Sequence, residues 1–239
     1  MDKTRSIDNI ELAKLKKEIV TLETQLTELI SKKALMEKLI QDYNNKFYSQ
    51  VGDLLMEVNK LRLEKLEQEA LLDPIKKDEF KQAQKENDEF NEHFGEIKSK
   101  KVPHLSDKEQ EILKRNFHKA CQLCHPDIVS DEFKDEATNL FADLKKAYDC
   151  NDILKVNQIL DLLEKLNYPT KSDKVTNKDR LRLLIDHLRI EIQKVKDEII
   201  EIERSDIYQL ITTIGDWDNY IAHIKKQLEH ETVLLTRNT

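Results

Sequence analysis

Residues that break helices are scarce in this sequence, which has only 3 Gly and 4 Pro in 239 residues. A protein built from several β-strands needs more turn residues than this. Charged residues make up 36% and hydrophobic residues 38% of the chain, with abundant Leu, Ile, Lys and Glu. That composition is typical of long helices and coiled coils. The sequence therefore predicts an all-α protein.

Long apolar runs and an excess of basic residues are also lacking. Without a run of about 18 apolar residues, we expect no membrane-spanning segment and no membrane partner. The start, MDKTRSIDNIELAKLKKEIV, has no uninterrupted apolar core of a signal peptide. A net charge of -7 argues against general nucleic-acid binding. The 3 cysteines, an odd number, favour reduced thiols in the cytoplasm over a disulfide framework.

A heptad pattern covers the N-terminal part of the chain. Its apolar positions are Leu12, Leu15, Ile19, Leu22, Leu26, Leu29, Met36, Ile40, Tyr43, Phe47 and Leu54, with only Lys33 and Gln50 as polar exceptions. This spacing favours a coiled coil, and a plain helical bundle would produce nearly the same pattern. The pattern continues to about Leu72, and Pro74 ends or kinks the helix. We assign residues 1–74 to an N-terminal coiled-coil arm.

A second heptad pattern follows a short linker, residues 169–176, and occupies a C-terminal arm, residues 177–239. Its positions are Leu181, Ile185, Leu188, Ile192, Val195, Ile199 and Ile202, then Ile207, Leu210, Ile214, Trp217, Ile221, Ile224, Leu228 and Leu235. The frame slips by one residue between Arg204 and Asp206. No Gly or Pro lies at the slip, so we expect one long helix with a local defect rather than a hairpin.

The two arms have similar lengths, on the order of 90 Å each as continuous helices. They can pair antiparallel within one molecule, with the intervening block at the tip. Alternatively, each arm pairs with its own copy in a parallel homodimer. Both arrangements bury the same apolar stripe, so the pattern does not distinguish them.

The middle block, residues 75–168 with a core at 106–166, differs from the two arms in its pattern of apolar residues. A polar helix with a sparse row of Phe80, Phe90 and Phe94 comes first. Ser106 and Glu109 then form a capping box that opens a second helix. The apolar side of this helix consists of Ile112, Leu113, Phe117, Ala120, Cys121 and Cys124. Pro126 stops it, and two further helices are expected between residues 130 and 166.

The segment CQLCHPD, which begins at Cys121, contains two overlapping signatures. C-x-x-C-H, ending at His125, is the attachment motif of a c-type haem. Cys121 and Cys124 could also bind zinc with His118, His125 or Cys150. We expect no export signal, and the sequence offers no second pair of metal ligands. Both cysteines lie on an apolar helix face, where Cys behaves as a small hydrophobe. We therefore expect core cysteines and neither metal nor cofactor.

The other signature is His-Pro-Asp, here called the HPD turn (His125, Pro126 and Asp127). A basic helix with Leu113 and Phe117 on its apolar side precedes it, and FADLKKAY, from Phe141, follows it. Over roughly residues 106–166 the sequence resembles the J domain of DnaJ-like co-chaperones. In that family a basic amphipathic helix precedes an exposed HPD loop, and an antiparallel helix with the pattern F-x-x-[IL]-x-x-A-Y follows.

The sequence departs from the family pattern upstream and downstream of the turn. The D-Y-Y-x-x-L-G-V segment usual in the family's first helix has no match. We expect residues near 88–98, with Phe90, Phe94 and Ile97, to pack on the hairpin in its place. After the HPD turn the chain has Ile128 and Val129, where the family often has Lys-Asn.

The resemblance implies that the chain binds a DnaK-type chaperone and stimulates its ATP hydrolysis, and that it is not itself an enzyme. The implied docking residues are those of the HPD turn and a basic face, namely His125, Pro126, Asp127, Lys114, Arg115, His118 and Lys119. The arms would then recruit an unknown client or partner, or form an oligomer. The alternative is a structural helical tether whose J-like hairpin no longer functions.

Overall fold

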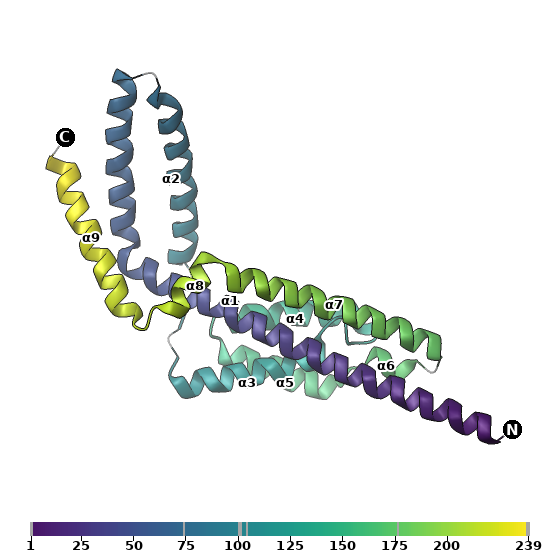
Figure 1. The fold of residues 1–239 in the computed structure, drawn as a ribbon. Helices are drawn as coiled ribbons and strands as arrows, with labels where there is room; N and C mark the ends of the chain where they lie inside the picture. The colour runs from purple at the N-terminus through teal and green to yellow at the C-terminus, as the bar shows by residue number, and fades with distance from the viewer. Residues whose placement is uncertain (1, 74, 100–101, 104, 176, 238–239) are drawn as a thin grey trace. The chain divides into compact units, whose positions relative to one another are not determined.

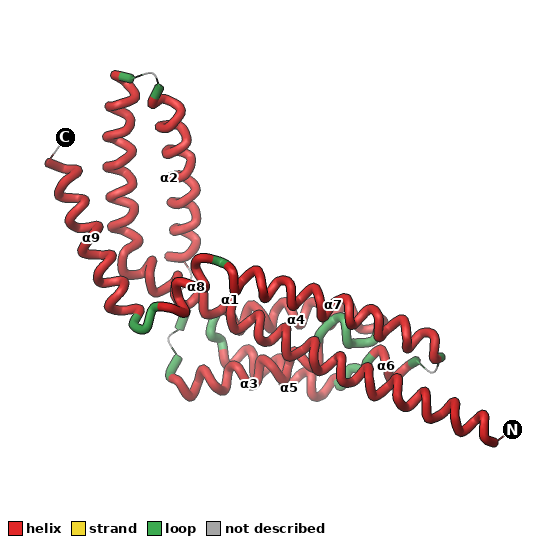
Figure 2. The backbone as a smooth tube through the Cα atoms, viewed as in Figure 1, coloured by secondary structure: helices red, strands yellow, loops and turns green. Residues whose placement is uncertain are grey.

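The computed structural model describes residues 2–73, 75–99, 102–103, 105–175 and 177–237. Nearly all of them are helical and none lies in a strand (Figure 2), which confirms the predicted all-α class. The helices are α1 (Asp2–Leu72), α2 (Lys76–Ser99), α3 (Asp107–Cys124), α4 (Lys134–Asp149), α5 (Ile153–Leu166), α6 (Lys171–Lys174), α7 (Lys178–Arg204), α8 (Asp206–Thr213) and α9 (Trp217–Arg237). A short 3-10 turn, η1 (Asp131–Phe133), precedes α4.

Over the described ranges, every helix is too short or too polar to cross a lipid bilayer.

The chain forms two compact units, and α1 contributes to both of them. The first unit combines Met1–Lys38 with Val102–Ser205. The second combines Leu39–Lys101 with Asp206–Thr239.

In the first unit, α3, α4 and α5 lie side by side (Figure 1). They pack around a common apolar core. The rings of Phe117 and Tyr148 stack at its centre, 4.1 Å apart. Cys121 and Cys124 are fully buried in the same core, which confirms that they are core residues. The predicted capping box is present, because Ser106 and Glu109 each accept a hydrogen bond from the backbone of the other.

Also in the first unit, α1 and α7 pair and run in the same direction (Figure 1). Lys178 pairs with Glu11 at 2.7 Å, and Arg189 pairs with Glu18 at 2.7 Å. The partners are 167 and 171 residues apart, and a nearly constant separation identifies a parallel pair. The antiparallel direction considered for pairing within one molecule is therefore wrong. An apolar stripe has no direction, and here the intervening chain delivers Lys178 beside Glu11.

A second buried stripe on α1 faces α6 and the hairpin, by which we mean α3 and α4 with α5 packed on them. Its members share a spacing of three or four residues and are mostly polar: Glu23, Thr27, Ser31, Ala34 and Lys38. Ala34 belongs to the hairpin core, and Nζ of Lys38 lies 5.4 Å from the centre of the Tyr148 ring. One helix face thus packs on α7 and another on the hairpin.

In the second unit, α2 and α9 pack on the later part of α1. Phe90 and Phe94 stack on one another at 6.1 Å and contact Tyr48 of α1, and Phe94 lies directly over Gly52. The expectation that these rings pack on the hairpin was wrong, since the helix that packs there is α1. The side chain of Ile97, the third residue of that expectation, lies outside the described residues.

The C-terminal arm is not the single helix that we expected. It is broken at Ser205 and again between Thr213 and Trp217. At the first break, both the backbone N–H and the hydroxyl of Ser205 donate to the Ile202 carbonyl, so the side chain competes with the helix ladder. At the second break, Asp216 accepts from the Asn219 N–H and caps α9.

Candidate functional site

The HPD turn follows directly from the end of α3. His125 adopts an extended conformation (φ -66°, ψ 125°), as a residue before proline must, and its N–H still donates to the Cys121 carbonyl at 3.1 Å. The His125 carbonyl accepts from the N–H groups of Ile128 and Val129, at 2.9 and 3.0 Å. These bonds fix the turn on both sides of Pro126.

The segment after α5 forms backbone hydrogen bonds with the residues that follow the turn. Ser130 donates its N–H to the Pro169 carbonyl, and Lys171 donates its N–H to the Ile128 carbonyl, both at 2.9 Å. Ile128 and Val129 are buried at this contact, with exposures of 4% and 2%. These two apolar residues after the turn are therefore interior residues of this chain.

The His125 ring is buried and held by several contacts. The Asp127 N–H donates to its Nδ1 at 3.2 Å, and the edge of the ring meets Phe141 with 5.1 Å between centroids. Burial lowers the pKa of His125 to about 4; Lys171 also lowers it, and Asp127 opposes the shift. Since Nδ1 accepts a hydrogen bond, the neutral ring carries its proton on Nε2.

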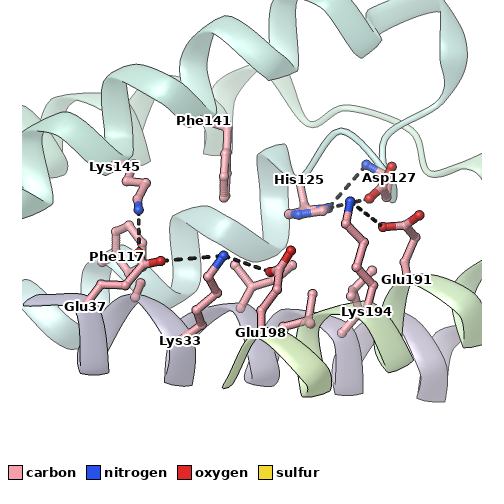
Figure 3. A pocket seen from close by; sticks show the side chains of 14 residues that line it. Lys33, Glu37, Phe117, His125, Asp127, Phe141, Lys145, Glu191, Lys194 and Glu198 are labelled. Carbon is pink, nitrogen blue, oxygen red and sulfur yellow. Dashed lines mark hydrogen bonds and ion pairs between the residues drawn. The ribbon is translucent and has the colours of Figure 1, made fainter. Parts of the chain in front are cut away.

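A cavity of about 220 Å³ lies beside the turn, between α1, α7 and the hairpin (Figure 3). His125 and Asp127 line it from the hairpin, Lys33 from α1, and Glu191 and Lys194 from α7. His125 is only 8% exposed, and the Asp127 side chain is 24% exposed. The exposed loop implied by the family resemblance is thus largely covered in this chain.

The charged groups of the cavity wall neutralise one another. Lys33 pairs with Glu198 at 2.8 Å and with Glu37 at 3.5 Å, and Lys145 pairs with Glu37 at 2.6 Å. Burial alone would lower the pKa of Lys33, but the two carboxylates outweigh it and raise that pKa. Lys33, a polar exception in the heptad pattern, accordingly joins α1 to α7, and Glu37 beside it joins α1 to the hairpin.

The structure separates the four residues of the predicted basic face. Lys114 and Arg115 are exposed on α3. Lys119 is exposed but pairs with Glu164 of α5 at 2.5 Å. His118 turns towards α1, where its Nδ1 lies 2.8 Å from the Ser31 hydroxyl. Lys114 and Arg115 therefore remain as the accessible cationic pair.

The two cysteines of the C-x-x-C-H string have the properties of buried, unreactive thiols. Burial raises the pKa of Cys124 to about 12 and that of Cys121 well above its usual range. Within the described part of the chain, no group of three or more His, Cys, Asp or Glu side chains is arranged to hold a metal ion.

Comparisons with protein-family models, with curated proteins and with solved structures found no match to this chain.

Sequence reasoning found the HPD turn but missed the residues that cover it. Glu191, Lys194 and Glu198 belong to the C-terminal arm, and Glu37 belongs to the N-terminal arm. The only sequence signal for this contact is the polar residue at position 33 of an otherwise apolar stripe.

Proposed function

We propose that this chain is a J-domain-like co-chaperone that docks on a DnaK-type chaperone through the HPD turn and stimulates its ATP hydrolysis. The observation that carries the proposal is the position of that turn. It joins α3 to α4, which pack on one another through the stacked rings of Phe117 and Tyr148. Backbone hydrogen bonds before and after Pro126 hold the turn. A turn that is rigid before docking loses little conformational entropy on binding.

The accessible charges also support the proposal. Lys114 and Arg115 are exposed on α3, the helix that ends at the turn. Such a cationic pair steers an acidic partner surface towards the turn and raises the association rate. The free thiols of Cys121 and Cys124 fit a reducing compartment, which makes the cytoplasm our proposed location.

A second function, a structural helical tether, is favoured by one observation. The docking elements are partly engaged inside the chain, since His125 is buried and Lys119 is paired with Glu164. A hairpin used only as a scaffold would show the same contacts. The two functions differ in whether Asp127 has any effect on a chaperone.

The test is the steady-state ATPase rate of a DnaK-type chaperone from the same organism. We expect the chain to raise this rate and Asp127→Asn to reduce the stimulation by about tenfold or more, because a charged docking group is lost. Asp131→Asn is the matched control, since Asp131 lies nearby with 86% of its side chain exposed. His125→Gln, with its fold checked by circular dichroism, is the second test of the turn.

The assay must include a chain in which α7 is loosened, because α7 lines the cavity at the turn. Ile192→Asp serves this purpose, as Ile192 is buried on α7 but does not line the cavity. Absence of stimulation by both the wild-type chain and this variant would contradict the co-chaperone function and leave the tether.

A further inference from the structure

A chaperone that docks on the HPD turn has to contact the side chains of His125 and Asp127. Both side chains face the inner side of α7. His125 and Asp127 line one wall of the cavity, and residues of α7 line the opposite wall. Figure 3 shows Lys194 and Glu191 of α7 directly across from them. A partner surface cannot contact both side chains while α7 occupies that place.

The helix that shares this wall, α1, is fixed to the hairpin itself. Ala34 is 5% exposed and belongs to the hairpin core. Ser31 bonds to His118 at 2.8 Å, and Glu37 pairs with Lys145 at 2.6 Å. Removing α1 would therefore open the hairpin core, so α1 is part of the platform on which the turn is built.

The attachment of α7 is of another kind. Its ion pairs with α1 include Lys178 to Glu11, Arg189 to Glu18 and Lys33 to Glu198. All of these side chains are partly exposed, and such pairs contribute little. The other contact that holds α7 is the apolar stripe that it buries. The residues that flank α7, Asn177 and Ser205, have extended backbone angles, so the helix is bounded by a non-helical residue at each end. A rigid helix between two such residues can move as one body.

We propose that α7 is an autoinhibitory cover over the HPD turn, and that the chain engages a chaperone only when α7 moves off the hairpin. This inference rests on the co-chaperone function proposed above. The closed form predominates, because opening exposes the apolar stripe of α7 to water. Stimulation by the wild-type chain is then limited by the small population of the open form.

The cover can be tested without any chaperone by labelling histidines with diethyl pyrocarbonate and quantifying the products by mass spectrometry. His187, which is exposed on α7, is the internal reference for the labelling rate. In the wild-type chain we expect His125 to react far more slowly than His187. In Ile192→Asp, which places a carboxylate in the buried stripe, the ratio of the two rates should rise about tenfold or more, as the open form becomes populated.

Ile190→Asp is the matched control, because Ile190 is on the same helix, is 65% exposed and receives the same substitution. It should leave the ratio unchanged. If His125 stayed protected in an Ile192→Asp chain with wild-type helical content, its burial would come from the hairpin alone, and the cover would be overturned. Equal reactivity of His125 and His187 in the wild-type chain would overturn it as well.

A milder variant avoids the risk that Ile192→Asp unfolds the chain. Arg189→Glu keeps the apolar stripe and replaces the ion pair to Glu18 with a repulsion. It should raise the labelling ratio by about twofold or more, in keeping with the small contribution of an exposed pair. Glu18→Arg in the same chain should restore the wild-type ratio. No change in Arg189→Glu, or no restoration by Glu18→Arg, would contradict a cover held by this contact.

Chaperone ATPase titrations separate this inference from the function on which it rests. If both hold, Ile192→Asp should reach half-maximal stimulation at about a tenfold lower concentration than the wild-type chain, and Asp127→Asn should abolish the effect. Equal stimulation by the wild type, Ile192→Asp and Ile190→Asp, all lost with Asp127→Asn, would keep the co-chaperone function and overturn the cover. Increased labelling of His125 without stimulation by any variant would keep the cover and overturn the co-chaperone function.

Discussion

The Ser31 hydroxyl of α1 lies 2.8 Å from Nδ1 of His118 on α3. The other ring nitrogen of His118 lies 3.1 Å from the Gln122 side-chain amide, so both nitrogens of this half-buried ring have partners. The residue that the sequence places on a basic docking face thus joins α1 to the hairpin. Ser31 lies on the second buried stripe of α1, where polar side chains meet the hairpin core.

A double-mutant cycle should detect this bond. Ser31→Ala and His118→Ala should each lower the free energy of unfolding by about 1 kcal/mol, with a coupling between them of about 0.5–1.5 kcal/mol, because each substitution removes the bond between the Ser31 hydroxyl and Nδ1 of His118. Urea unfolding measures all four proteins. Ser49→Ala is the control, since the Ser49 hydroxyl bonds only the carbonyl of Lys46 on an exposed face. Strictly additive effects of the two substitutions would contradict the bond.

Two neighbouring aliphatic residues of α3 should differ sharply in their effect on stability. Leu113 is 1% exposed in the hairpin core, whereas Ile112 is 37% exposed. Leu113→Ala should lower the free energy of unfolding by about 2–5 kcal/mol, through lost burial and the cavity that remains. Ile112→Ala should cost less than about 1 kcal/mol. Urea unfolding of the two variants provides the comparison. Similar losses of unfolding free energy would mean that α3 buries a different face from the one that contains Leu113.

Two glycines in the second unit give opposite expectations for the same substitution. A Cβ atom at Gly52 would lie 2.1 Å from Cε2 of Phe94, whereas one at Gly95 would have no atom within 4 Å. Gly52→Ala must displace the aromatic ring, which should cost about 1–3 kcal/mol. Gly95→Ala should stabilise by about 0.5–1 kcal/mol, since alanine favours the helix. Thermal unfolding tests both, and stabilisation by Gly52→Ala would rule out the close packing of α2 on α1.

Local structure could be predicted from the sequence because local chemistry determines it. The spacing of apolar residues predicts the helices, Ser106 with Glu109 predicts the start of α3, and Pro126 predicts its end. The burial of Cys121 and Cys124 follows from their place on the apolar face of α3.

What could not be predicted depends on contacts between distant segments. The apolar stripes of α1 and α7 are the same whether the helices run parallel or antiparallel. The ion pair of Lys178 with Glu11 distinguishes the two directions, and it forms only after the intervening chain has folded. The polar stripe that includes Ser31 and Lys38 resembles a solvated helix face until the hairpin covers it. The cavity at His125 likewise depends on three segments that are far apart in sequence.

Glu23 is the buried carboxyl group of that stripe. It is 8% exposed, and its Oε1 has no hydrogen-bond partner. Burial, reinforced by Asp173 and opposed by Lys171, raises the pKa of Glu23 to about 7. Between its ordinary pKa near 4.5 and about 7, the folded chain therefore binds more protons at this site than the unfolded chain does. This contribution to stability is complete below pH 4.5 and is lost as the pH rises to 7. His125, whose pKa is lowered to about 4, has the opposite slope.

Replacing Glu23 with glutamine isolates its contribution, because the His125 slope is common to both proteins and cancels in the difference. Near pH 4.5 we expect Glu23→Gln and the wild type to unfold with nearly equal free energies. The variant should become progressively more stable than the wild type up to pH 7, by about 2–3 kcal/mol, and the difference should stay constant above that pH. Urea unfolding at closely spaced pH values gives this curve, with Glu28→Gln at an exposed position of α1 as the control. A difference that does not vary with pH would mean that Glu23 is ionised in the folded chain across the whole range, and that its carboxylate has a partner or water where α1 meets α6.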